Sequence, residues 1–366
     1  MSERETKRLT RREVLAASVA ASVAAARGKP AVAAPPRAEE ITKEPKKLRA
    51  DKKAARFRWV QMERHPQPVL RARPGTWEAM WFVTGSVIQV GGRLRMYYEA
   101  SEKHNRDSRL GLAYSDDGVT WQRYEGNPIW TKNKDSWQHF LRDVQVCRFE
   151  GEEGYWLYYS DGDRHIDLAH SADGIHWKNS EHNPMLTVSQ PWEAFLMQQY
   201  VMKLGPEKWY MWYSTYSGKP RVTGLATSTD GLHWTKYKDN PVFLTGESGQ
   251  WDDYSAFQPV VFRQDGYFHM LYTGSSKENS AGYRWGYAWS SDGIRWTKSP
   301  DNPVFLPGPK GAWDAGKVAG HTIYRTGPNT YNIYYAGAPA PDATYIGIGL
   351  VRARLQKVGG LEEAGQ

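Results

Sequence analysis

Four acids in this sequence are candidates for catalysis, and each stands next to a tryptophan, an arginine or a second acid: Glu78, Asp143, Glu193 and Asp253. Paired carboxyl groups can carry out acid–base chemistry, because a protonated carboxyl donates a proton while an ionised one acts as a base or nucleophile. Such pairs work only when the fold brings residues far apart in the chain to one place. The elements that position these acids therefore decide which of them can act together.

The acids fall at fixed places in an internal repeat. The pattern Ser-x-Asp-Gly-x-x-Trp occurs at residues 115–121, 171–177, 228–234 and 290–296. An Asn-Pro pair follows each copy, and a later tryptophan is followed by an acid or amide, at Trp137, Trp192, Trp251 and Trp313. Between these motifs lie short β-rich segments, for example at 144–149, 155–160 and 166–171. Four antiparallel strands per repeat of this size predict the blade of a β-propeller.

The two ends of the chain predict five blades. The first unit begins at Trp77, whereas the last begins at Trp313 and stops at residues 345–350, where its third strand ends. Its missing outer strand has a counterpart at the other terminus, since residues 67–70 match 240–243. We therefore expect an all-β, five-bladed propeller over residues 57–355, closed by its own N-terminal strand. Closure of this kind covers a sheet edge.

Strand direction separates two faces of the predicted ring. Each innermost strand starts on the face that carries the loop between strands two and three, and the Asp-Gly turn lies on the opposite face. The repeated turn acids Asp117, Asp173, Asp230 and Asp292 are therefore expected to hydrogen-bond their own turns. The candidate acids near the starts of the innermost strands are expected around the central channel.

Within that group, Asp143 is unusual because it is the only acid at its place in the repeat. Its counterparts are Gln198 and Gln258, and Arg142 precedes it. Acids that follow the repeated tryptophans, such as Glu78 and Glu193, have a second interpretation as a repeated structural feature of the blades. In the catalytic interpretation Glu193 donates the proton, and Glu78 or Asp253 serves as the base.

Further residues are expected to bind a substrate beside these acids. They are Arg142, Trp81, Phe195, Gln198 and Gln258. Aromatic rings can stack on the apolar faces of sugars, although a single aromatic residue in a propeller more often packs between blades.

The basic charge of the chain belongs to its N-terminal segment. Residues 1–56 hold 15 lysines and arginines against 7 acids, and the remainder is balanced at 33 against 33. A neutral body gives no electrostatic case for a nucleic-acid partner. The single cysteine, Cys147, excludes an internal disulfide bond and metal sites built from several cysteines.

The N-terminal segment resembles an export signal of the twin-arginine type. Arg11 and Arg12 precede an alanine-rich run at 16–26, and small residues suited to cleavage follow at 31–33. We expect a signal peptide at 1–33, a linker at 34–56 and a tail at 356–366, with a periplasmic or extracellular location. The alanine run is too short to anchor the protein stably in a membrane.

The repeat resembles that of the five-bladed propeller glycosidases, which include glycoside hydrolase families 43, 32, 62, 68, 117 and 130. The resemblance implies hydrolysis of glycosidic bonds in an oligo- or polysaccharide by paired carboxyl groups. Arg142-Asp143-Val144 is similar to the Arg-Asp-Pro segment whose aspartate supports the transition state. Pro191-Trp192-Glu193 is similar to the segment that carries the general acid.

Two further segments bear on this resemblance. Residues 319–322 resemble a Gly-His-x-Ser segment, which implies that His321 faces a central Ca²⁺, another metal ion or a water, although the hydrolysis itself requires no cofactor. The families place an aspartate on the innermost strand of blade one, whereas residues 82–87 contain no acid. A carbohydrate-binding propeller without catalysis therefore stands as the alternative.

Overall fold

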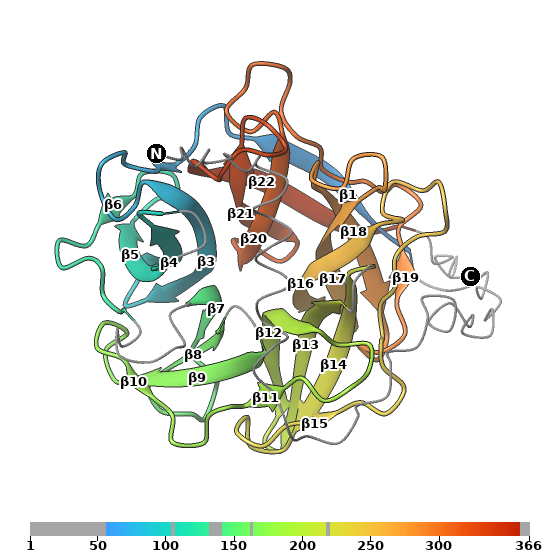
Figure 1. Cartoon of the computed structure of the whole chain (residues 1–366), viewed down its shortest axis with the longest axis horizontal. Coiled ribbons are helices and arrows are strands. Elements are labelled where there is room, and N and C mark those ends of the chain that lie inside the picture. The colour runs from blue at the N-terminus through green and yellow to red at the C-terminus, as the bar shows by residue number, and fades with distance from the viewer. Residues whose placement is uncertain (1–55, 104–106, 132–140, 162–163, 217–219, 359–366) are drawn as a thin grey trace, which may run out of the picture.

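The computed structural model describes residues 56–103, 107–131, 141–161, 164–216 and 220–358. The predicted signal peptide and nearly all of the predicted linker lie outside these residues, as does Trp137. Twenty-two strands form five antiparallel sheets arranged around a centre (Figure 1). The predicted all-β, five-bladed propeller is confirmed. The described residues contain no helix, and hence none that could cross a membrane.

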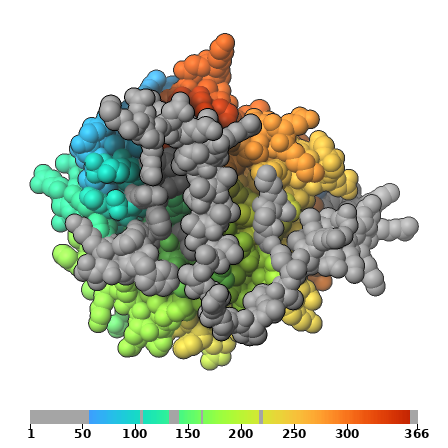
Figure 2. Space-filling model, viewed as in Figure 1, coloured from blue at the N-terminus to red at the C-terminus, as the bar shows by residue number. Residues whose placement is uncertain are grey.

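Blades one to four each run from the centre outwards in chain order, and Figure 2 shows them following one another around the ring. Blade one contains β3 (Met80–Val90), β4 (Arg93–Ser101), β5 (Arg109–Ser115) and β6 (Gln122–Arg123). Blade two contains β7 (Arg142–Cys147), β8 (Tyr155–Ser160), β9 (His165–Ser171) and β10 (Lys178–Asn179), with β11 (Leu186–Thr187) also paired to β9. Blade three contains β12 (Phe195–Gly205), β13 (Lys208–Tyr216), β14 (Val222–Ser228) and β15 (Thr235–Lys236). Blade four contains β16 (Ser255–Gln264), β17 (Tyr267–Ser275), β18 (Arg284–Ser290) and β19 (Thr297–Lys298).

Blade five is assembled from both ends of the chain. Its inner strands are β20 (Lys317–Arg325), β21 (Thr330–Ala338) and β22 (Gly347–Val358). The outer strand is β1 (Arg56–Arg64), and β2 (Leu70–Arg71) pairs with the start of β22. Figure 1 shows β1 beside β22, so closure by an N-terminal strand is confirmed. The paired strands extend one residue before the predicted start of the propeller and three residues past its predicted end.

The Asp-Gly turns have the structural role that was expected of them. In blade one, Asp117 Oδ1 accepts hydrogen bonds from the backbone N–H groups of Val119 and Thr120, each at 2.7 Å. These two bonds, more than any other interaction, lower the pKa of the Asp117 carboxyl. Asp173, Asp230 and Asp292 repeat the same bonds in their own turns.

We predict that deleting residues 1–70 lowers the melting temperature of the whole ring, because β22 then loses its outer partner. The deletion also removes the buried rings of Phe57 and Trp59, and truncating such a ring to alanine typically costs about 3–5 kcal/mol. Deleting residues 1–50 retains β1 and is the matched control. Equal melting temperatures for the two truncations would contradict closure by β1.

Candidate active site

In four blades, the acid that follows the repeated tryptophan forms an ionic hydrogen-bond unit, which we call the blade clasp. Glu193 Oε1 accepts from the hydroxyl of Tyr213 at 2.9 Å, and its other oxygen contacts Lys236 of the outermost strand. The same combination of acid, tyrosine from the second strand and cation from the outermost strand occurs in three other blades. Its members there are Glu78, Tyr98 and Arg123; Asp252, Tyr272 and Lys298; and Asp314, Tyr335 and Arg64.

These clasps occupy the oxygens of two predicted catalytic acids. Glu78 and Glu193 are buried, with 0% and 5% of their surfaces exposed, and Glu193 also accepts from the backbone N–H groups of Ser189 and Gln190. Asp253 is held in the loop before β16, where it accepts from the backbone N–H groups of Gly249 and Lys277. The geometry therefore favours the structural interpretation of Glu78 and Glu193. Asp253 stabilises the conformation of its loop through these backbone hydrogen bonds.

One position on the innermost strand of every blade faces the central channel. Strand register makes the five residues equivalent, and they are Thr84, Asp143, Gln198, Gln258 and Gly320. Four of them lie at a β-bulge with positive φ, between 45° and 54°, and Thr84 is the exception. Left-handed backbone is costly for a residue branched at Cβ, and blade one instead has two register shifts, with Trp81 at φ 50°.

The five positions surround a cavity of about 60 Å³, with lining residues from all five blades. Several polar atoms of the lining are buried without a hydrogen-bond partner among the described residues. They are Thr84 Oγ1, Gln198 Oε1, Gln199 Oε1 and the two ring nitrogens of His321. Buried polar groups are normally satisfied, and a cavity of this size has room for water. The predicted residues Asp143, Gln198, Gln258 and His321 thus share one polar cavity.

Asp143 is the acid of this lining. Its Oδ2 accepts from the hydroxyl of Ser160 at 3.0 Å. Burial raises the pKa of the Asp143 carboxyl, while the charge of Arg142 opposes the shift. The backbone carbonyl of Asp143 accepts from Gln199 Nε2 at 2.5 Å. The bulge is therefore fixed by side chains from two blades.

Glu99, on β4, joins Asp143 at the mouth of the channel. Its Oε2 accepts from the backbone N–H of Asp143 at 2.8 Å, and its Oε1 accepts from the indole N–H of Trp81 at 2.8 Å. Burial, followed by the neighbouring charge of Asp143, raises the pKa of Glu99 to about 8. Burial thus raises the pKa of both carboxyl groups, and the charge of Asp143 raises that of Glu99 further. Neighbouring carboxyl groups with raised pKa values are typical of acid–base sites.

Sequence reasoning missed Glu99, although the repeat contains the signal. Strand register makes Glu99 equivalent to Ser160, Ser214, Thr273 and Ala336. It is the only acid at its place in the five blades, as Asp143 is at its own. The comparison of innermost strands that singled out Asp143 would have found Glu99 if it had been extended to the second strands.

Aromatic and basic side chains surround this pair. Arg142 lies over the ring of Trp81, with its Cζ 5.0 Å from the ring centroid, and Tyr345 meets the same ring edge-on at 5.4 Å. Across the channel, Arg221 lies over Phe257 at 4.8 Å and donates to the hydroxyl of Tyr283 at 2.8 Å.

Phe195 stacks on Tyr216 at 5.0 Å, and Tyr216 is a second ring beside Arg221. The predicted binding residues Trp81, Arg142 and Phe195 therefore belong to this set of aromatic and basic side chains, which we call the aromatic and basic surround.

A metal site at His321 was tested against its donors. The described residues contain no group of three His, Cys, Asp or Glu side chains placed to hold a metal ion. Burial lowers the pKa of His321 to about 4, which leaves a neutral ring packed against Trp285 at 5.1 Å. Calcium prefers six to eight oxygen ligands with several carboxylates. The donors around the cavity include one carboxylate and do not match that requirement.

Comparisons with known proteins agree with this architecture. The model for the glycosyl hydrolases family 32 N-terminal domain matches residues 60–197. A glycosyl hydrolase structure from Bacteroides ovatus has a TM-score of 0.64 at 19% identity and covers 82% of this chain and 98% of its own. The chain has the five-bladed propeller fold of the glycosidase superfamily. The fold that the resemblance in the repeat implied is confirmed.

One further solved structure and one curated protein are similar to this chain. One is a structure of the GH130 family, which contains mannoside phosphorylases and glycoside hydrolases that target β-1,2-mannosidic linkages in Candida mannan. It has a TM-score of 0.62 at 19% identity, over 82% of this chain and 94% of its own. An uncharacterized protein of Mycobacterium tuberculosis is 26% identical over 220 residues, which are 57% of this chain and 72% of that protein.

The raised pKa of Glu99 predicts a pH dependence of stability. Between about pH 4.5 and 8 the folded protein binds a proton that the unfolded chain releases, so the free energy of unfolding falls as the pH rises through that window. The substitution Glu99→Gln removes the titrating group and should flatten this part of the profile. Urea unfolding at about pH 6 and about pH 9 measures the difference. Parallel profiles for the two proteins would show that Glu99 titrates normally.

Proposed function

We propose that this protein is a glycoside hydrolase whose chemistry is centred on the Asp143–Glu99 pair. The observation that carries the proposal is the contact between neighbouring blades in which the Glu99 carboxylate accepts from the backbone N–H of Asp143, with burial raising the pKa of both carboxyl groups. Their raised pKa values allow the pair to hold a proton near neutral pH. Hydrolysis of a glycosidic bond requires a proton donor and a base. Two carboxyl groups that hold one proton supply a protonated donor and an ionised base.

In the proposed mechanism Asp143, which lines the cavity, contacts the substrate. The glycosidic oxygen takes a proton from the pair as its bond to the anomeric carbon breaks. Water then adds to that carbon, and the proton that the water loses returns to the pair. Glu99 positions Asp143 through the backbone hydrogen bond and shares its proton. This assignment replaces Glu193 as the donor and Glu78 or Asp253 as the base.

The aromatic and basic surround supports a sugar ligand. Trp81 is held by Glu99 and Arg142, so its ring is fixed beside the carboxyl pair. Arg221, Phe257 and Tyr283 form a second wall on blades three and four. Rings of this kind offer apolar faces for the C–H groups of a sugar, and the arginines offer hydrogen-bond donors for its hydroxyl groups.

A carbohydrate-binding propeller without catalysis is the second candidate. The observation in its favour is the innermost strand of blade one, where the propeller glycosidases carry an aspartate: residues 82–87 contain no acid, and its channel position is Thr84. The clasps also withdraw Glu78 and Glu193 from chemistry. Under this candidate the channel mouth binds sugar, and the carboxyl pair only orders Trp81 and the Asp143 bulge.

Turnover measurements on matched variants separate the two candidates. A screen on diverse oligosaccharides first identifies a substrate. Asp143→Asn and Glu99→Gln should then each lower turnover per folded molecule by about 10²–10⁴-fold, because general acid catalysis is worth that much. Glu193→Gln is the matched control. It should lower the free energy of unfolding by about 3 kcal/mol, because Lys236 loses its buried partner, and it should leave turnover per folded molecule nearly unchanged.

The contrary results are distinct. Full activity in Asp143→Asn and Glu99→Gln, with loss in Glu193→Gln, would restore Glu193 as the proton donor. An absence of turnover on every glycan, together with sugar affinity that survives Asp143→Asn better than Trp81→Ala, would support the binding propeller.

We also propose that the protein is exported to the periplasm or the exterior through a twin-arginine signal at residues 1–33. The order of Arg11-Arg12, the alanine-rich run and the small residues at 31–33 supports it. Replacing both arginines with lysine should leave the precursor in the cytoplasm, as cell fractionation would detect. Unchanged export of the double variant would refute the proposal.

A further inference from the structure

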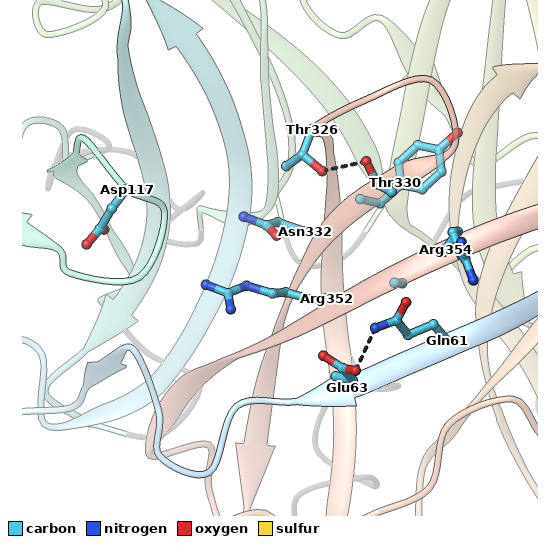
Figure 3. A pocket seen from close by; sticks show the side chains of 10 residues that line it. Gln61, Glu63, Asp117, Thr326, Thr330, Asn332, Arg352 and Arg354 are labelled. Atoms are coloured by element: carbon cyan, nitrogen blue, oxygen red, sulfur yellow. Dashed lines mark hydrogen bonds between the residues drawn. The ribbon is translucent and has the colours of Figure 1, made fainter.

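A larger pocket lies on the opposite side of the propeller from the channel mouth, between the sheet of blade five and the Asp117 turn of blade one (Figure 3). Its volume is about 360 Å³. The lining is polar and includes Gln61, Glu63, Asn332, Arg352 and Arg354. The candidate active site uses none of these residues.

The walls of this pocket are set by strand register. Glu63, Arg352 and Asn332 form one row across β1, β22 and β21, and Gln61, Arg354 and Thr330 form the next row on the same face. Residues two apart on a strand point the same way. Arg352 and Arg354 of β22 therefore lie on the face that lines the pocket, flanked on both sides by side chains that can form hydrogen bonds.

The pocket exists because blade five lacks the large side chains that fill this gap elsewhere. The paired positions occupied here by Asn332 and Arg352 hold Trp156 and His170 in blade two. Those two rings meet edge-on at 4.6 Å. The corresponding pairs are Arg95 with Tyr114, Tyr210 with Thr227, and His269 with Trp289. The short Asn332 leaves a hollow between blade five and the Asp117 turn of blade one.

The charges in the pocket are available to a ligand. Arg352 and Arg354 are exposed, and neither side chain has an ion-pair or hydrogen-bond partner among the described residues. Figure 3 shows Arg352 extending towards the side of the pocket on which Asp117 lies. Glu63 accepts from Gln61 Nε2 at 2.5 Å, which fixes it at the outer wall.

We propose that this pocket is a second saccharide-binding site that takes an acidic sugar unit. The guanidinium groups of Arg352 and Arg354 bind the sugar carboxylate, since the planar fork of arginine matches a carboxylate. The carboxylates of Glu63 and Asp117 accept hydrogen bonds from the sugar hydroxyls, and the amide of Asn332 can donate or accept. The choice of a glycan as the ligand rests on the proposed function, whereas the anion site rests on the two arginines alone.

Calorimetric titration of the full chain carrying Asp143→Asn tests this site without turnover. The probes are glucuronic acid, glucose and inorganic phosphate. We expect glucuronic acid to bind at least about tenfold more tightly than either of the others. Adding Arg352→Gln and Arg354→Gln should weaken its binding by about 10- to 100-fold, the range expected for charged hydrogen bonds. Asn332→Trp, which restores the bulk found in blade two, should block the site.

Arg58→Gln is the matched control, because Arg58 is an exposed arginine of the neighbouring strand that pairs with Asp301 instead. It should leave the affinity unchanged. Equal affinity in the arginine and Asn332→Trp variants would overturn the proposal, as would phosphate binding as tight as that of glucuronic acid. These binding results are independent of turnover, so a protein without hydrolase activity could still confirm this second site, and an active one could lack it.

Discussion

Pairing between β1 and β22 is the constraint on which the rest of the molecule depends. It joins the first and last described strands and turns five sheets into a ring. The same strand delivers Arg64, the cation of the blade-five clasp with Asp314, and the outer wall of the pocket at Arg352. A ring that is closed in this way holds the five channel positions at fixed places. The meeting of Asp143 with Glu99 depends on that rigidity.

The repeat makes structure and chemistry separable. Features found in several blades, such as the Asp-Gly turns and the clasps, stabilise each blade and are explained by contacts within it. Features found once are candidates for function. Glu99 and Asp143 are single departures on adjacent strands of neighbouring blades, and they meet. Asn332 is a third departure, and it opens a pocket.

The fold could be predicted from the sequence because four blades repeat one turn motif and because the missing strand of the last unit has a match near the N-terminus. The site could be predicted only in part. Asp143 was found because an alignment of the innermost strands alone shows an acid where other blades have Gln198 and Gln258. The role of Glu193 was harder to judge, since its partners Tyr213 and Lys236 come from other strands of its blade. Glu99 was missed because its contact with Asp143 crosses between blades, and sequence spacing does not encode that contact.

The presence of an acid in the sequence did not by itself identify the catalytic residues, because the partners of each acid differ in the folded ring. A clasp acid such as Glu193 has its carboxyl oxygens taken up by a tyrosine hydroxyl and a cation of its own blade. Glu99 lies where burial and Asp143 favour its neutral form. Two acids of similar burial can therefore have opposite roles, and the difference depends on partners that only the folded ring supplies.

The most direct test of the account is the crystal structure of the Asp143→Asn variant with a bound oligosaccharide substrate. The account predicts that a glycosidic bond lies at the channel mouth, next to the substituted position and Glu99, with a sugar ring against Trp81. A sugar bound instead against Glu193 and Lys236, away from the channel, would contradict it.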